Sequence, residues 1–340
     1  MKTVLIQAAL LVAALGVAYQ TWTHEEGAAD SPGSTRVWEG RPEELSSLTY
    51  RSDEVRTVIE RREDDAGSYL WATVVHPAAP APADSLADTP GDTTATTLAQ
   101  GRPGADSVSF LVGDQGERLA ELAASPLAIR DLGIPDDARM QEYELNEPEG
   151  RLTIVLGGTE RTLEIGGAPW GSSDQYVRDP ATGRAYVLDA PLLRMMSNAQ
   201  MSLPERRLHA FEDDRVEQVT VRTTGGARTM RRATGGDGAA TWVLPDQPES
   251  PDQTFANFME RVGRLWLQEF APEKEMGELE HVVRIDYVDS RGNEIGYLDL
   301  YREEGEEGPA YFVRTELSRV LAAVLPSIAE QIEQDVNTLF

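Results

Sequence analysis

Short runs of alternating apolar and polar residues, each separated from the next by a turn dipeptide, recur along much of this chain. Between residues 142 and 188 the separators are Gly157-Gly158, Gly166-Gly167 and Asp179-Pro180. A period of two predicts strands with one buried face, and turn dipeptides between successive strands favour antiparallel neighbours. The five predicted strands cover 142–145, 152–156, 161–165, 175–178 and 185–188. This segment therefore predicts an antiparallel β meander.

Around this meander the first half of the chain carries further elements. Alternating residues between Leu48 and Val75, with a turn at 64–67, predict a hairpin whose second arm bears Trp71. Helical spacing of apolar residues begins at Val108 and is firm over 117–124. A second helix is expected over 192–201, because Pro191 suits a first helical turn.

The second half repeats this order of parts. Alternating valines at 216–221, a return arm at 229–233 and a third arm bearing Trp242 predict a hairpin followed by one more strand. Ser250 as N-cap, Pro251 in the first position and Gln253 in a capping box predict a helix whose apolar face runs from Phe255 to Trp266. Strands at 282–288, 295–301 and 311–314 and an amphipathic helix at 317–336, kinked or split at Pro326, complete it. The predicted fold is α+β, with two tandem similar units of antiparallel β meander plus helices.

The first residues are apolar, and from Val4 to Tyr19 only Gln7 is polar. The length of this apolar run lies between that of a signal-peptide core and that of a bilayer span. Lys2 at one end and the aromatic Tyr19 and Trp22 at the other favour a transmembrane anchor over 1–22, and a small-residue site at 16–18 leaves a cleaved signal as the alternative.

Composition shifts divide the rest of the chain. Residues 23–36 are small and acidic, which predicts a flexible stalk. A Pro-, Ala- and Thr-rich stretch at 77–106 predicts a mobile insert within the first unit. The predicted units are 37–210 and 211–340. The localisation expected from the anchor is single-pass in the inner membrane, with the C-terminal body in the periplasm or otherwise outside the cytoplasmic membrane.

Charge and cysteine content exclude several classes of function. The 340 residues carry a formal net charge of −27, which repels phosphate backbones and argues against a nucleic-acid partner. The chain has no cysteine, so disulfides, thiolate metal sites and cysteine nucleophiles are excluded.

A search for catalytic and metal-binding motifs nominates no residue. The four histidines, His24, His76, His209 and His281, have no partner three or four residues away, so a zinc site is not predicted. Neither a nucleophile elbow nor a phosphate-binding loop occurs. The run Glu303–Glu307 has two interpretations, a weak calcium loop or a solvated hairpin tip, and the spacing favours the tip. We therefore expect no enzyme activity, cofactor or metal.

The meander resembles a bacterial family of domains of unknown function. The resemblance is carried by Tyr143, Leu145, 152–156, 161–166, 175–178, 185–188, Leu192, Leu193 and 206–208. Members of that family have one N-terminal membrane span and an extracytoplasmic domain, and are often encoded beside ABC transporters of the gliding-motility type. The resemblance supplies no catalytic residues.

Three functions follow as expectations. The first is a membrane-anchored, periplasm-facing, non-enzymatic accessory or scaffolding protein, with the permease and ATPase of an ABC-type transport or surface-export system as partners. The second is a secreted or periplasmic hydrolase whose Ser, His and Asp are scattered in sequence. The third is an acidic, cation-binding envelope protein, in which the negative charge captures its ligand.

Overall fold

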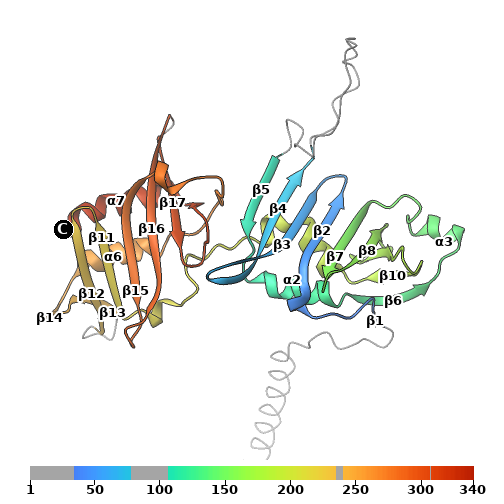
Figure 1. The fold of residues 1–340 in the computed structure, drawn as a ribbon, viewed down its shortest axis with the longest axis horizontal. Helices are drawn as coiled ribbons and strands as arrows, with labels where there is room; N and C mark the ends of the chain where they lie inside the picture. Colours follow the sequence, from blue (N-terminus) through green and yellow to red (C-terminus); the bar gives the residue numbers. More distant parts are fainter. Residues whose placement is uncertain (1–33, 78–105, 235–239, 307) are drawn as a thin grey trace, which may run out of the picture.

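Alternation of buried and exposed side chains persists along the strands of both halves, and the strands assemble into two antiparallel sheets (Figure 1). The computed structural model describes residues 34–77, 106–234, 240–306 and 308–340. The predicted anchor at 1–22 lies outside these residues, as do nearly all of the stalk and of the insert. Among the described residues, no helix has both the length and the apolar character that a membrane span requires.

The first lobe is built on a ten-stranded sheet in the order β1-β6-β10-β9-β8-β7-β2-β3-β4-β5. Its strands are β1 (Thr35–Arg36), β2 (Leu45–Ser52), β3 (Arg56–Asp64), β4 (Gly67–His76), β5 (Asp106–Leu111), β6 (Leu127–Gly133), β7 (Gly150–Leu156), β8 (Thr159–Ile165), β9 (Gln175–Arg178) and β10 (Ala185–Leu188). Its helices are η1 (Pro42–Glu44), α2 (Gln115–Ala124), α3 (Asp137–Glu142), α4 (Ala190–Ser197) and α5 (Ala199–Ser202). Strand β1 lies within the predicted stalk, and its pairing with β6 corrects that prediction for Thr35 and Arg36.

The second lobe is built on an eight-stranded sheet in the order β14-β13-β12-β11-β15-β16-β17-β18. Its strands are β11 (Gln218–Thr223), β12 (Gly226–Thr234), β13 (Ala240–Leu244), β14 (Gln247–Pro251), β15 (Glu280–Val288), β16 (Glu294–Gly305), β17 (Gly308–Thr315) and β18 (Ala322–Ala323). Its helices are η2 (Asp213–Arg215), α6 (Gln253–Val262), η3 (Met276–Glu278) and α7 (Pro326–Leu339). Every strand pair in both sheets is antiparallel, so the class is α+β and rich in β structure.

The two sheets share one order of strands. In the first lobe four strands run outward from β2 to β5, α2 follows, and β7 returns to pair with β2. In the second lobe four strands run outward from β11 to β14, α6 follows, and β15 returns to pair with β11. Helix α2 packs against α4, and α6 packs against α7. Strands β1 and β6 and helix α3 are additions of the first lobe.

The two tryptophans of the predicted hairpins occupy matching strands but pack differently. Trp242 lies on β13 and contacts Phe255 of α6 edge to face, with ring centroids 5.6 Å apart. Trp71 lies on β4 and is buried against Phe270 of the other lobe, with centroids 6.0 Å apart. Trp71 therefore belongs to the junction between the lobes, whereas the partly buried Trp242 packs against the core of its own lobe.

The prediction of a strand at 142–145 is wrong. Asp136 caps α3 by accepting a hydrogen bond from the Arg139 N–H, and the chain leaves the helix through Glu144, whose φ is 57°. The Tyr143 ring then stacks on Tyr176 with centroids 4.3 Å apart, and its carbonyl accepts from the Gly167 N–H. Gly166 passes so close that a Cβ there would lie 2.2 Å from the Tyr143 carbonyl oxygen. Residues 142–145, which carry part of the family resemblance, therefore contribute packing contacts and no strand.

Four helix predictions also differ from the structure. The helix expected over 192–201 forms two helices, α4 and α5, which are separated at Asn198. Residues 108–111 belong to β5, because they pair with β4, and the helix begins at Gln115. Helix α6 is capped by Asp252, which accepts from the Phe255 N–H, while Ser250 and Pro251 extend β14. Helix α7 begins at Pro326, since a proline suits the first helical turn, and the preceding residues form β18 and a loop.

Candidate functional site

The junction between the lobes is held by the loop at 316–320, which leaves β17 and leads to β18. The loop is fixed by hydrogen bonds from the Ser318 N–H to the Thr315 hydroxyl and from the Thr315 N–H to the Ser318 hydroxyl. Arg319 projects from it with a φ of 64°, a left-handed conformation that costs a non-glycine residue about 1 kcal/mol. Its guanidinium forms an ion pair with Asp64 and lies 5.1 Å from the centre of the Tyr69 ring.

The same loop contacts the connection between the lobes, residues 203–217. The Glu316 carboxylate accepts from the Ala210 and Tyr297 N–H groups and from His209 Nδ1, which lies 3.1 Å from one oxygen. The His209 ring stacks on Phe211 and meets Tyr287 edge to face. Burial raises the pKa of Tyr287 far above its ordinary value. Loop 316–320 thus contacts both the first lobe and the connection.

At its start, the connection is bound to the first lobe by a buried carboxylate. Glu205 accepts from the backbone N–H groups of Arg206 and Arg207 and from the Arg207 side chain, which also pairs with Asp114. Burial acts to raise the pKa of Glu205, but the hydrogen bonds from Arg207 outweigh it and hold this pKa below its ordinary value. The Glu205 N–H donates to the Leu111 carbonyl, which fixes the connection to β5.

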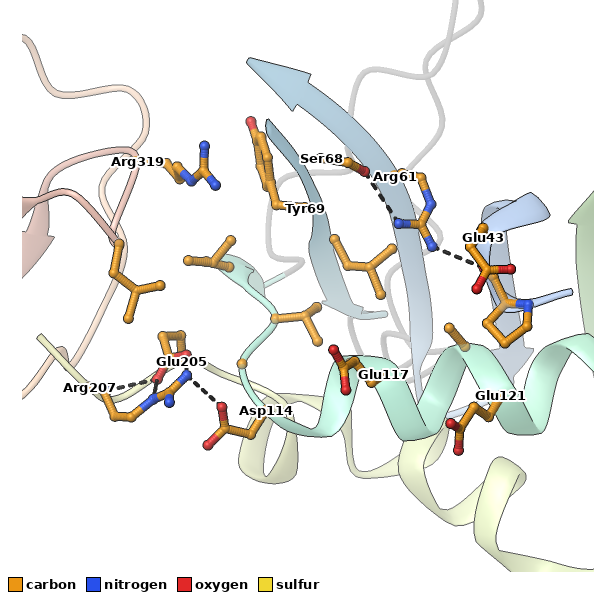
Figure 2. A pocket seen from close by; sticks show the side chains of 18 residues that line it. Glu43, Arg61, Ser68, Tyr69, Asp114, Glu117, Glu121, Glu205, Arg207 and Arg319 are labelled. Atoms are coloured by element: carbon orange, nitrogen blue, oxygen red, sulfur yellow. Dashed lines mark hydrogen bonds and ion pairs between the residues drawn. The ribbon is translucent and has the colours of Figure 1, made fainter. Parts of the chain in front are cut away.

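A cavity of about 800 Å³ opens between these groups (Figure 2). Figure 2 shows Arg319 extending toward Tyr69 from the second lobe, with Glu205, Arg207 and Asp114 at the start of α2. Apolar lining residues come from both lobes and include Leu70, Leu111, Val112, Ala120 and Leu317.

Among the described residues, the charged side chains of the cavity that remain without an ion-pair partner are acidic. Its three arginines are engaged: Arg319 with Asp64, Arg207 with Glu205 and Asp114, and Arg61 with the carbonyls of Leu45 and Pro42 and the Ser68 hydroxyl.

By contrast, Glu43 of η1 and Glu117 and Glu121 of α2 are exposed, and their carboxylates form no ion pair with another described residue. Carboxylates beside an apolar surface suit a ligand that carries positive charge on an apolar stem, such as an arginine or lysine side chain.

The histidines that sequence reasoning singled out are dispersed. His76 Nε2 lies 3.0 Å from the Gln200 side-chain oxygen, and His281 Nε2 lies 3.0 Å from Asp299, which also pairs with Arg284. His209 and Asp213 line a separate cavity of about 350 Å³, and none of its described lining residues is a serine, threonine or cysteine. His24 lies outside the described residues.

The acidic run at 303–307 is partly neutralised within the protein. Glu303 pairs with Lys274 at 2.7 Å, and Glu304 pairs with Arg302, two residues earlier on β16. Within the described ranges, no group of three His, Asp or Glu side chains could hold a metal ion. Residue 307 lies outside those ranges.

Sequence reasoning missed the residues that form the junction. Arg319 lies 255 residues from Asp64, and Glu316 lies 106 residues from Ala210, so no local spacing relates them. One local signal was present, because Asp114, Glu117 and Glu121 are spaced three and four residues apart and share a helix face.

The fold and the cavity together define a two-lobed antiparallel α+β protein. The cavity of about 800 Å³ at the lobe junction is called the acidic recess below. A family comparison matches residues 105–280 to the domain of unknown function DUF4340, and the chain belongs to this family. The match runs from β5 of the first lobe to the start of β15 in the second. No curated protein and no solved structure matches the chain.

Proposed function

We propose that this chain is a membrane-anchored, periplasm-facing accessory or scaffolding protein that binds a basic segment of a partner in the cavity between its lobes. The observation that carries the proposal is the acidic group of Glu43, Glu117 and Glu121, which are exposed around an apolar floor while the cavity's arginines are engaged by neighbours. A guanidinium or ammonium group would donate charge-assisted hydrogen bonds to such carboxylates, and its stem would cover Leu70 and Val112.

Binding fits this cavity better than catalysis for a chemical reason. Among the described residues that line it, hydroxyl groups belong to Ser68 and Tyr69, and none of these residues is a histidine. Ser68 accepts from Arg61, and Tyr69 lies under the Arg319 guanidinium. A base within hydrogen-bond reach of a nucleophile is the arrangement that acyl transfer needs, and neither hydroxyl has one in the cavity.

The partner we propose is an ABC-type transport or surface-export system. The apolar segment at 1–22 would place the body beside a membrane-embedded permease, and the ATPase would be held through the permease. Support comes from the family resemblance, whose members are often encoded beside such transporters. The matching strand order of the two lobes is consistent with an internal duplication that created the recess between them.

Co-purification of the tagged full chain from detergent-solubilised membranes tests this function. Wild type is compared with the triple variant Glu43→Gln/Glu117→Gln/Glu121→Gln. The control is Glu160→Gln/Glu249→Gln/Glu330→Gln, which makes the same charge change at exposed positions outside the cavity. We expect a permease and its ATPase with wild type and control, and at least fivefold less of both with the cavity variant. Recovery of neither protein, or equal recovery with both variants, would contradict the proposal.

A further inference from the structure

A second cavity, of about 460 Å³, lies beside the connection, between the edge strand β5 and an extended segment of the second lobe. One wall is β5, through Val108, Ser109 and Phe110, and the other is the extended segment 268–270 of the second lobe. Figure 1 shows β5 on the side of the first lobe that faces the second. This cavity shares no lining residue with the acidic recess.

The free backbone groups of β5 can be assigned from its register. Val112 donates its N–H to the Leu70 carbonyl, toward β4, whereas the Leu111 carbonyl accepts from Glu205 on the opposite side. Because successive residues of a strand alternate in the direction of their backbone groups, Val108 and Phe110 bond to β4, and Ser107 and Ser109 point outward. Among the described residues, no strand pairs with this outward side of Ser107 and Ser109.

The facing wall presents a matching edge. Ala271 donates to the Leu321 carbonyl and Glu269 accepts from the Ala323 N–H, which leaves Phe270 in the bridge position opposite Ala322. In an antiparallel bridge of this kind the central residue directs its own N–H and C=O away from its partner strand. The backbone groups of Phe270 are therefore available on the side away from β18.

Residues 203–205 of the chain already pair with the C-terminal end of the β5 edge. Pro204 forms an antiparallel bridge with Val112, and Gly113 and Leu111 bond to Leu203 and Glu205. At Arg206 the connection turns away, and its carbonyl and guanidinium bond instead to Leu267 and Gln268 of the second lobe. The ladder therefore ends beside Phe110 although the edge continues to Ser107.

We propose that an extended segment of a partner protein adds to β5 in this cavity, antiparallel to β5 and in line with residues 203–205. Its backbone would bond to Ser109 and Ser107 on one side and to Phe270 on the other. Apolar side chains at alternate positions would cover the partly buried Val108 and the exposed Met201, and polar ones would face Arg206 and Glu269. The inference does not depend on the acidic recess, since its residues and variants are different.

Hydrogen exchange on the full chain in detergent tests the edge. We expect the amides of Ser107 and Ser109 to exchange at least tenfold faster than those of Val108 and Phe110, when single residues are resolved by mass spectrometry. Slow exchange at Ser109 in the free chain would mean that another part of the protein occupies this edge, and would overturn the proposal.

Binding is tested with random twelve-residue peptides displayed on phage and selected on the full chain. Ser109→Pro removes one outward N–H and leaves the bonds to β4 in place, because a proline is tolerated at an edge position. Ser109→Ala is its control, since it also loses the hydroxyl bond to Thr73 but keeps the N–H. Met201→Glu, with Ile134→Glu at another exposed position as its control, tests the groove without altering a strand.

Selected peptides should alternate apolar and polar residues, bind wild type, Ser109→Ala and Ile134→Glu alike, and lose at least tenfold in affinity for Ser109→Pro and Met201→Glu. Failure to select any peptide, or equal binding to Ser109→Pro and Ser109→Ala, would overturn the inference. The inference would also be overturned if the free chain dimerises and Ser109→Pro abolishes the dimer. In that case the segment bound at the edge would belong to a second copy of this chain.

Discussion

The guanidinium of Arg319, in the second lobe, lies 5.1 Å from the centre of the Tyr69 ring in the first lobe and pairs with Asp64 of the same hairpin. One side chain thus spans the lobe junction, and its backbone adopts a left-handed conformation, with a φ of 64°. The ion pair and the ring contact offset the cost of that conformation. The wall of the acidic recess depends on this residue.

Substitutions of Arg319 separate the side-chain contacts, which stabilise the fold, from the cost of the left-handed backbone. Arg319→Ala should lower the free energy of unfolding by about 1–3 kcal/mol, because it removes the ion pair and the contact with Tyr69 and keeps the backbone cost. Arg319→Gly also removes the side chain but relieves the left-handed conformation, so it should be about 1 kcal/mol more stable than Arg319→Ala. Urea unfolding of both variants measures the difference. An alanine variant at least as stable as the glycine variant would contradict this account.

Glu205 should make stability depend on pH below its ordinary pKa of 4.5. Its folded pKa is lowered, so its contribution is fully present above about pH 4.5 and is lost as the pH falls through the folded value. Glu205→Gln should cost about 1–3 kcal/mol at pH 7, because the buried site loses a charged acceptor. The difference in the free energy of unfolding between wild type and Glu205→Gln should become smaller as the pH falls below 4.5.

Unfolding titrations at pH 7 and at pH 3.5 measure that gap. Asp114→Asn serves as the control, since it removes the exposed partner of the same Arg207 and should cost less than about 1 kcal/mol at either pH. A gap between wild type and Glu205→Gln that is the same at both pH values would show that the carboxylate does not act through its charge.

Gly166→Ala should destabilise the first lobe by about 2 kcal/mol or more. A Cβ at this position would meet the Tyr143 carbonyl oxygen at 2.2 Å, so the Tyr143–Tyr176 stack would have to move. Gly277→Ala is the matched control, because a Cβ there has no heavy atom within 4 Å and the backbone needs no left-handed conformation. Thermal unfolding followed by near-ultraviolet circular dichroism reports both variants, and equal melting temperatures would refute the prediction.

Glu316→Gln should cost about 1–3 kcal/mol although it preserves shape. The carboxylate accepts from two backbone N–H groups, of Ala210 and Tyr297, through different oxygens. A glutamine must turn its NH₂ toward one of these donors, which leaves that donor without an acceptor. Glu330→Gln on an exposed face of α7 gives the baseline in the same urea titration, and a loss no larger than this baseline would count against the assignment.

Local patterns were sufficient to predict most strands of both lobes. The runs that became β7, β8, β9 and β10 were predicted within two residues, because turn dipeptides mark their ends. Patterns failed where a short apolar run suits both a helix and a strand. Val108 and Leu111 have helical spacing, but pairing with β4 made them a strand.

Prolines and caps caused the other errors. Pro326 was expected to interrupt a helix that instead begins there, and Asp252 rather than Ser250 accepts from the first helical turn. The junction could not be predicted, because Arg319, Asp64 and Tyr69 meet through the packing of two lobes. A sequence pattern indicates which face of an element is buried and does not indicate which distant element covers it.

Site-specific photocrosslinking in intact cells tests the central claim, that the acidic recess binds a membrane partner. A photoreactive amino acid replaces Glu117, inside the cavity, or Glu330, on the exposed face of α7. The account predicts an adduct with a membrane-embedded permease at position 117, through a segment that contains lysine or arginine, and none at position 330. An identical set of adducts at the two positions, or an adduct at 117 only with non-membrane proteins, would contradict it.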